Sequence, residues 1–163
     1  MIGRAALICA LSAGVASAQT ADEVQAAATN MWLAVSTCFE HARSLNTLVP
    51  GFEAAGFSIG TDLDATTFQA FGVMGYLNPT HPNFFCSLQS EIVPFAVAQQ
   101  VVADNLAAAF PNAQIGAAEP SIDNLGCPMR AVTLDGETYD LLFLNAGNGI
   151  VCSAPDTSAI LFQ

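Results

Sequence analysis

The stretch 130–144, RAVTLDGETYDLLFL, decides the fold class of this chain. It contains two runs of apolar and β-branched residues on either side of Asp135-Gly136. An Asp-Gly pair between two such runs is a strong signal for a tight β-hairpin. In the second run, alternate residues from Tyr139 to Phe143 would lie on one face of a strand. The sequence therefore predicts a hairpin made of strands 130–134 and 138–144.

Further strands are predicted on both sides of this hairpin, at Phe71–Leu77, Phe84–Gln89, Ile150–Cys152 and, as a final edge strand, Ala159–Phe162. Two prolines and two asparagines between residues 78 and 83 make the connection between the first two strands a loop. In the second strand, Cys86 alternates in step with the apolar residues and should point inward.

Two helices are predicted. Residues 21–44 carry apolar side chains at spacings of three and four, which places Cys38 on the core-facing side. Pro94 opens a second helix that ends at about Phe110, before Pro111. Between the helix and the first strands, Pro50-Gly51 should break the chain before a short turn that ends at Gly56.

The predicted order is one helix, two strands, a second helix and three or four more strands, with a surface loop at 111–126. This order indicates an α+β fold, with an antiparallel sheet of about five strands, two main helices packed on one face, and disulfides that staple the layers. No internal repeat is visible. We therefore expect residues 19–163 to form a single domain.

Residues 1–18 have the layout of a secretory signal peptide. Arg4 precedes an apolar run that ends in Ala16-Ser17-Ala18, and we place the cleavage site after Ala18. A retained membrane anchor is the alternative, but a span needs about 20 apolar residues and this run is shorter. A lipoprotein signal is disfavoured because Ile8 precedes Cys9 where a small residue is required. We predict a periplasmic or secreted protein.

The charge pattern limits the partners of the mature chain. The chain has no lysine, and loss of Arg4 with the leader leaves two arginines against 14 acidic residues, a formal charge of −12. Binding of nucleic acid or anionic lipid needs cationic side chains that replace counterions. We therefore expect no nucleic acid partner. Because no later segment offers an uninterrupted apolar span, we expect no membrane insertion of the mature chain.

Four cysteines remain in the mature chain, and an even number in an exported protein indicates disulfides with three possible pairings: Cys38, Cys86, Cys127 and Cys152. If the last strands form a simple meander, Cys127 and Cys152 are separated by a third strand, a gap of about 10 Å that a disulfide cannot span. This favours bridges from Cys38 and Cys86 to those two. Zinc bound by Cys38 and His41 is the alternative, but the second close ligand pair is missing.

Several short motifs resemble catalytic or metal sites. Gly56–Gly60 matches the G-x-S-x-G nucleophile elbow, but no strand precedes it, so a turn is the expected structure. His41 and His81 are candidate general bases, although each lacks an evident partner. Asp62-Leu63-Asp64 contains only a fragment of a calcium loop.

No residue is predicted to be catalytic, to ligate a metal or to bind a cofactor. Trp32 lies off the apolar stripe of its helix, so it is either a partly buried core residue or an anchor for a ligand. We expect a non-enzymatic module that binds a small molecule or a protein. The alternatives are a small hydrolase that uses His41 or His81, and an envelope assembly or inhibitor protein.

Overall fold

The computed structural model describes residues 19–42, 44–63, 65–78, 84–147 and 150–163. The predicted signal peptide lies outside these ranges. The helices are α1 (Ala21–Glu40), α2 (Leu48–Ala54) and α3 (Phe95–Ala109), with short 3₁₀ turns η1 (Leu45–Thr47) and η2 (Ile122–Asn124). The strands are β1 (Ser58–Asp62), β2 (Ala65–Ala70), β3 (Val73–Leu77), β4 (Cys86–Ser90), β5 (Gln114–Ile115), β6 (Glu119–Pro120), β7 (Pro128–Leu134), β8 (Glu137–Leu144) and β9 (Ser158–Phe162).

All nine strands belong to one antiparallel sheet. Its order is β1-β2-β3-β4-β9-β8-β7-β5, and β6 also pairs with β7. The predicted hairpin is confirmed as β7 and β8, joined at Asp135-Gly136 with positive φ at both residues. The α+β class holds, but the prediction of about five strands was too low. It missed β1 and β2, which bury only Phe68 between them and so lack a clear apolar alternation. It also missed β5 and β6, two-residue exposed strands that pair with β7 inside the predicted surface loop at 111–126.

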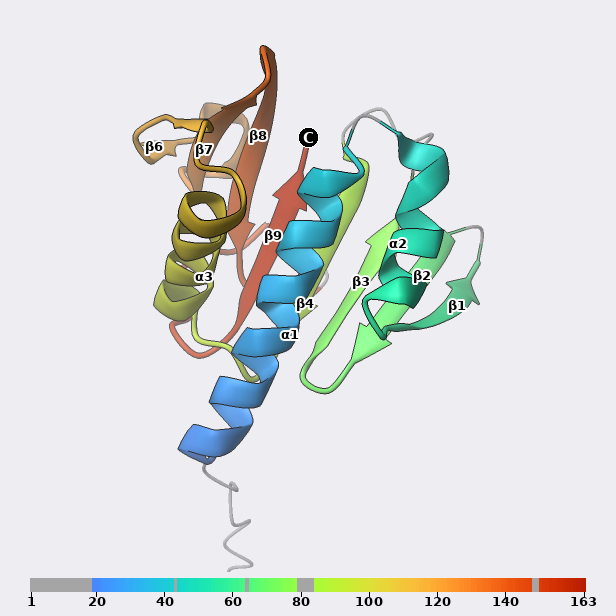
Figure 1. The fold of residues 1–163 in the computed structure, drawn as a ribbon. Coiled ribbons are helices and arrows are strands. Elements are labelled where there is room, and N and C mark those ends of the chain that lie inside the picture. The colour runs from blue at the N-terminus through green and yellow to red at the C-terminus, as the bar shows by residue number, and fades with distance from the viewer. Residues whose placement is uncertain (1–18, 43, 64, 79–83, 148–149) are drawn as a thin grey trace, which may run out of the picture.

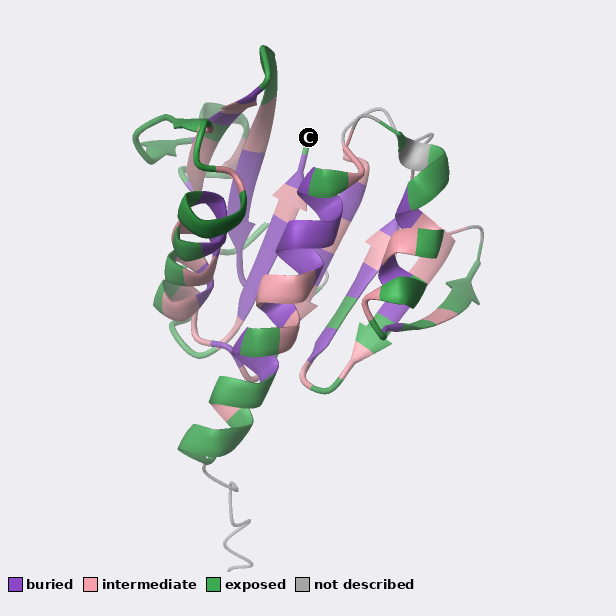
Figure 2. Cartoon of the chain, in the orientation of Figure 1, coloured by how far each residue is buried: buried purple, intermediate pink, exposed green. Residues whose placement is uncertain are grey.

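The three helices cover one face of the sheet (Figure 1). The prediction counted two main helices and placed a break at Pro50-Gly51, whereas these residues lie inside α2. Pro50 is the third residue of that helix, where a missing N–H breaks no helical hydrogen bond. The first helix ends at Glu40, earlier than the predicted end at residue 44. Side chains from all three helices and the facing strands form the main core, coloured as buried in Figure 2.

β9 occupies the centre of the sheet, although it was predicted as a final edge strand. It pairs with β4 on one side and with β8 on the other. Four of its five residues are buried, the exception being Leu161. The last strand of the chain therefore joins the two halves of the sheet.

The disulfide pairing differs from the favoured one. Cys38 of α1 is bonded to Cys86 of β4, and Cys127 is bonded to Cys152, with Cα–Cα distances of 6.2 and 5.5 Å. The prediction assumed that Cys152 lies on a strand, but residues 150–152 have no regular structure. The assumed separation by a third strand therefore does not exist.

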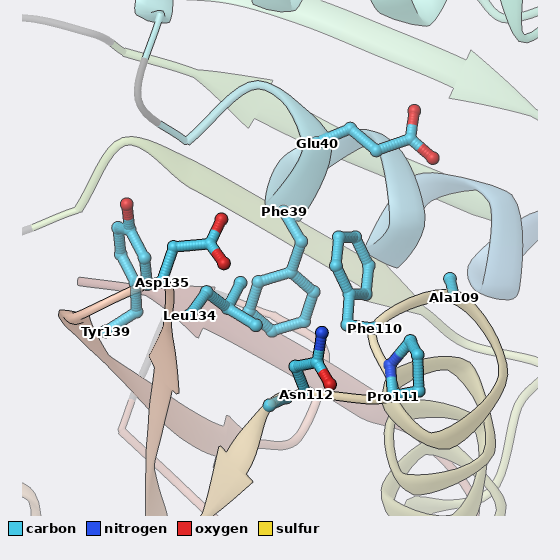
Figure 3. Close-up of a pocket in the computed structure, with 10 residues that line it drawn as sticks. Phe39, Glu40, Ala109, Phe110, Pro111, Asn112, Leu134, Asp135 and Tyr139 are labelled. Carbon is cyan, nitrogen blue, oxygen red and sulfur yellow. The ribbon is translucent and has the colours of Figure 1, made fainter.

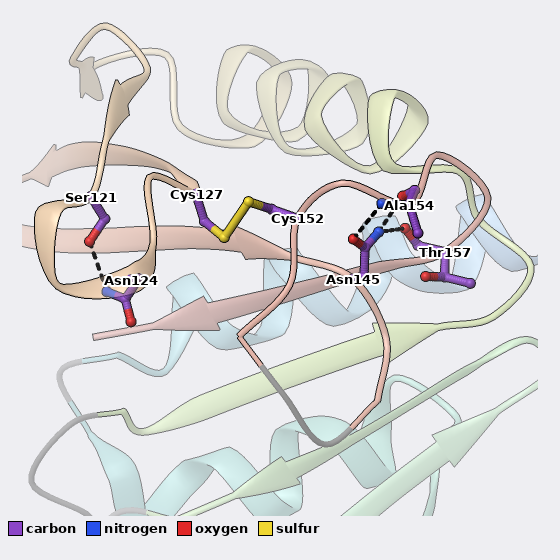
Figure 4. The surroundings of a disulfide bond; sticks show 7 residues. All are labelled: Ser121, Asn124, Cys127, Asn145, Cys152, Ala154 and Thr157. Carbon is purple, nitrogen blue, oxygen red and sulfur yellow. Dashed lines mark hydrogen bonds between the residues drawn. A yellow bond between two sulfur atoms is a disulfide. The ribbon is translucent and has the colours of Figure 1, made fainter.

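The described residues of the segment after β8, 145–147 and 150–157, lie on the sheet face opposite the helices, and we call them the strap. Under it lies a second small core of Cys127, Leu142, Leu144 and Ala159. The buried Asn145 side chain holds the strap in shape (Figure 4): its amide donates to the carbonyls of Ala154 and Thr157, and its Oδ1 accepts from the Ala154 N–H at 2.9 Å. A polar side chain satisfied in this way can be buried at little cost.

Within the described ranges, no helix has the length and apolar character needed to cross a membrane.

Candidate functional site

His41 is a structural residue at the end of α1. Its Nδ1 lies 2.6 Å from the Thr47 hydroxyl, and that hydroxyl donates its single proton to the Ser44 carbonyl at 2.7 Å. Nδ1 must therefore carry a proton and donate to Thr47. The His41 ring also packs on Gly51, where a Cβ atom would overlap Nε2. These contacts tie the end of α1 to α2. The other candidate base, His81, lies outside the described residues.

The carboxylate beside His41 belongs to a shallow hollow rather than to a catalytic pair. Glu40 accepts a hydrogen bond from Ser36 at 3.2 Å. It borders a hollow of about 260 Å³ lined also by Phe39, Phe110 and Tyr139, and Figure 3 shows its carboxylate directed away from those rings. His41 is not among the lining residues. The structure therefore does not place the candidate base and this carboxylate in one cavity.

The G-x-S-x-G match is a helix end followed by an edge strand. Gly56 ends α2 with φ of +90°, a conformation that favours glycine. Ser58 is an exposed residue at the start of β1. A nucleophile elbow requires a strand before the serine and a helix after it, and here the order is reversed. The chain forms the predicted turn at Gly56.

The metal hypotheses find no support in the described part of the chain. Cys38, Cys86, Cys127 and Cys152 are all in disulfides, so Cys38 is not available as a zinc ligand. Among the described residues, no group of three histidine, cysteine or acidic side chains is arranged to hold a metal ion. Asp62 ends β1 near the Tyr76 hydroxyl, at 3.5 Å, and Asp64 lies outside the described residues.

The strongest candidate site is a groove of about 490 Å³ between α1 and α3, which we call the Trp32 groove. It is lined by Gln25, Ala28, Thr29, Trp32 and Leu33 of α1 and by Val97, Gln100, Val101 and Asp104 of α3. The two helices lie on the outer side of the sheet (Figure 1). Pockets for small molecules typically measure about 300–1,000 Å³ and are mostly apolar with few polar groups.

The floor and the rim of the Trp32 groove differ in character. Leu33, Val97 and Val101 are half-buried and apolar, whereas the rim carries exposed amide, hydroxyl and carboxylate groups. On the rim, Gln100 Nε2 donates to Asp104 Oδ1 at 2.7 Å. Asn105, which is fully buried, donates from Nδ2 to the Trp32 carbonyl at 3.1 Å and joins the two helices at this level.

Sequence reasoning identified only one member of this site. Trp32 stood out because it falls beside the apolar stripe of α1. Asp104 and Gln100 gave a weaker signal, a polar pair four residues apart on α3, which is also typical of any solvated helix face. These two residues and Trp32 line one groove only because α3 packs against α1.

A second feature is a set of exposed apolar side chains close in sequence to the two cysteines of the Cys127–Cys152 bridge, which Figure 4 shows. Ile122 and Leu125, just before Cys127, are 97% and 83% exposed. Ile150 and Val151, just before Cys152, are 43% and 50% exposed. The disulfide links the two segments that carry these side chains.

The chain was compared with protein-family models, curated proteins and solved structures, and none of the three comparisons gives a match. The fold and the groove define the class by themselves: a disulfide-bonded α+β protein with one antiparallel sheet and a helix-lined groove.

Proposed function

We propose that this protein is a non-enzymatic binding module of the periplasm or the extracellular space, and that a small molecule occupies the Trp32 groove. The observation that carries the proposal is a groove of about 490 Å³ whose apolar floor is flanked by the half-buried Trp32. Two disulfides support a protein that matures in an oxidising compartment.

The test is a variant that blocks the groove with a bulky side chain without changing any core residue. Thr29 is an exposed rim residue, so Thr29→Phe should fill the groove, whereas Ala26→Phe places the same ring on an exposed position of α1 outside it. Because Trp32 is the sole tryptophan, its fluorescence reports on the groove directly. A fragment library screened by fluorescence and NMR should give ligands that lose binding in T29F and keep it in A26F. Equal binding by both variants would contradict the proposal.

A second candidate function, binding of a protein partner, is favoured by the exposed Ile122 and Leu125. Exposed apolar area of this kind often marks an interface. An envelope assembly or inhibitor role predicts that a defined chain copurifies with the protein. The double variant Ile122→Ser/Leu125→Ser should abolish that copurification while T29F leaves it intact.

The hydrolase alternative depends on His41 or His81. Since His41 Nδ1 already donates to Thr47, His41→Ala is expected to lower stability rather than remove an activity. A hydrolytic activity that disappears in either His→Ala variant, with an unchanged melting temperature, would revive this alternative.

A further inference from the structure

We propose that the Trp32 groove selects an organic cation with an apolar body, such as a quaternary ammonium compound. This inference rests on the proposed function and adds the chemical class of the ligand. It follows from three features of the groove: its single charge, its aromatic side chain and the absence of a competing cation.

The single charge is the carboxylate of Asp104. None of the other described residues that line the groove is ionisable. Gln100 holds Oδ1 at 2.7 Å, which orients the carboxylate on the rim. Oδ2 accepts no hydrogen bond from the described residues, so one oxygen remains available to a ligand. A carboxylate presented in this way attracts a positive group and repels an anion.

The aromatic side chain is the indole of Trp32, which lines the same groove from the opposite helix. The face of an indole ring is the best side-chain partner for a cation, and recognition of quaternary ammonium groups commonly uses it. The apolar floor of Leu33, Val97 and Val101 would receive the carbon atoms of the ligand. A hydrated metal ion would find one carboxylate and no second acidic ligand here.

Among the residues that the structure describes, no cationic side chain pairs with Asp104. The chain has no lysine, and the groove is lined by no arginine or histidine. Arg130, the arginine within the described ranges, lies on β7. The formal charge of −12 expected for the mature chain also raises the local concentration of cations around the molecule. The groove is therefore electrostatically complementary to a cation.

The experiment uses the folded, disulfide-bonded protein and three probes of nearly identical shape. Choline is the cation, neohexyl alcohol is its neutral carbon isostere, and tert-butylacetate is the anion. Trp32 fluorescence and amide chemical shifts of α1 and α3 report binding. We expect choline to bind about five-fold more tightly than the alcohol, and the anion not to bind.

Matched variants distinguish binding of choline at Asp104 from general electrostatic attraction of cations by the acidic protein. Asp104→Asn should weaken choline binding about three-fold and leave the alcohol unchanged. Asp123→Asn removes an equal charge from η2, outside the groove, and should leave both affinities unchanged. An equal effect of D104N and D123N would overturn the assignment to Asp104.

The remaining outcomes distinguish the two proposals. If the alcohol binds as tightly as choline and T29F blocks it, the cation proposal is wrong and the binding groove stands. If none of the probes perturbs Trp32 and the fragment screen finds no groove ligand, both proposals are wrong.

Discussion

At the scale of single residues, Gly75 of β3 is a position where neighbouring groups leave no room for a side chain. It lies directly opposite Phe68 of β2, and the Phe68 ring covers it. Phe68 in turn stacks on Phe52 of α2, with ring centroids 4.0 Å apart. Glycine is required because only a residue without a side chain leaves space for that ring.

We predict that Gly75→Ala destabilises the protein by about 1–3 kcal/mol, because a Cβ atom would overlap both the Phe68 ring and the Ser87 carbonyl. The control is Gly60→Ala in β1, where the new methyl meets only the Thr67 hydroxyl at 2.9 Å. Urea unfolding of the two variants measures the difference. Equal stability of G75A and G60A would show that Phe68 relaxes freely.

Asn105 is a second residue whose substitution should change the free energy of unfolding measurably. It is fully buried, and its Oδ1 has no hydrogen-bond partner among the described residues. An unsatisfied buried acceptor is costly. The Trp32 carbonyl that receives Nδ2 also has its ordinary helical partner within α1, so loss of the Asn105 amide leaves it satisfied.

Asn105→Leu should therefore raise the free energy of unfolding or leave it within about 1 kcal/mol of the original value. Asn105→Asp should lower it by at least about 2 kcal/mol, because it buries a charge. Thermal and urea unfolding of both variants provide the measurement. A clear loss of stability in N105L would mean that Oδ1 has a partner of its own, such as a water molecule.

At the scale of elements, the start of α1 is set by a capping box. Thr20 Oγ1 accepts from the Glu23 N–H at 3.2 Å, and the Thr20 N–H donates to the Glu23 carboxylate at 2.8 Å. The backbone N–H and then the hydroxyl of Thr20 hold the pKa of Glu23 below its ordinary value of 4.5. Both donors favour the ionised carboxylate.

The lowered pKa predicts a contribution to acid sensitivity. Since the folded state releases this proton more readily than the unfolded state, the contribution of Glu23 to stability is present above pH 4.5 and is lost as pH falls through the lowered pKa. Glu23→Gln should therefore lose less stability than the original protein between neutral pH and about pH 3. Glu53→Gln on α2 is the control. If both variants lose equally little stability at low pH, the assignment of this acid sensitivity to Glu23 is contradicted.

The two disulfides connect different pairs of elements and should differ in their effects. The Cys38–Cys86 bridge joins α1 to β4 through the main core and spans 48 residues, whereas the Cys127–Cys152 bridge ties down the strap and spans 25. In the chain-entropy model these separations correspond to about 4 and about 3.5 kcal/mol. Loss of the first bridge also leaves space between buried layers.

We predict that Cys38→Ala/Cys86→Ala is the less stable double variant. In Cys127→Ala/Cys152→Ala, hydrogen exchange should accelerate mainly in the strap and little in α1 and α3. Urea unfolding gives the ranking, and hydrogen exchange followed by mass spectrometry gives the location. Faster exchange throughout the sheet in the second variant would show that the strap supports the whole fold.

At the scale of the whole molecule, both cysteine pairs formed in the structure agree with maturation outside the reducing cytosol. We predict that protein isolated from an exported fraction starts at Gln19 and has a mass about 4 Da below its reduced form, because each disulfide removes two hydrogens. Intact mass before and after reduction measures both features. Retention of Met1, or four free thiols, would contradict the predicted export and oxidation.

Much of the local structure was predictable from the sequence because its signals are local. The Asp135-Gly136 turn, the spacing of apolar residues along α1, and Pro94 before α3 each act within a few residues. In contrast, β1 is an exposed edge strand, and its sequence resembles a polar loop. The predicted strand at Ile150–Cys152 shows the opposite error, since apolar residues there form part of the strap.

The sequence by itself determined the α+β class, the main hairpin, the two long helices and the four cysteines of the disulfide framework. Only the tertiary structure decided the place of β9, the pairing of those cysteines and the placement of Trp32 and Asp104 along one groove. The physical reason is sequence distance: the N–H of Phe85 donates to the carbonyl of Phe162 at 3.0 Å, across the C-terminal half of the chain. Hydrophobic periodicity within an element does not specify which distant element will cover it.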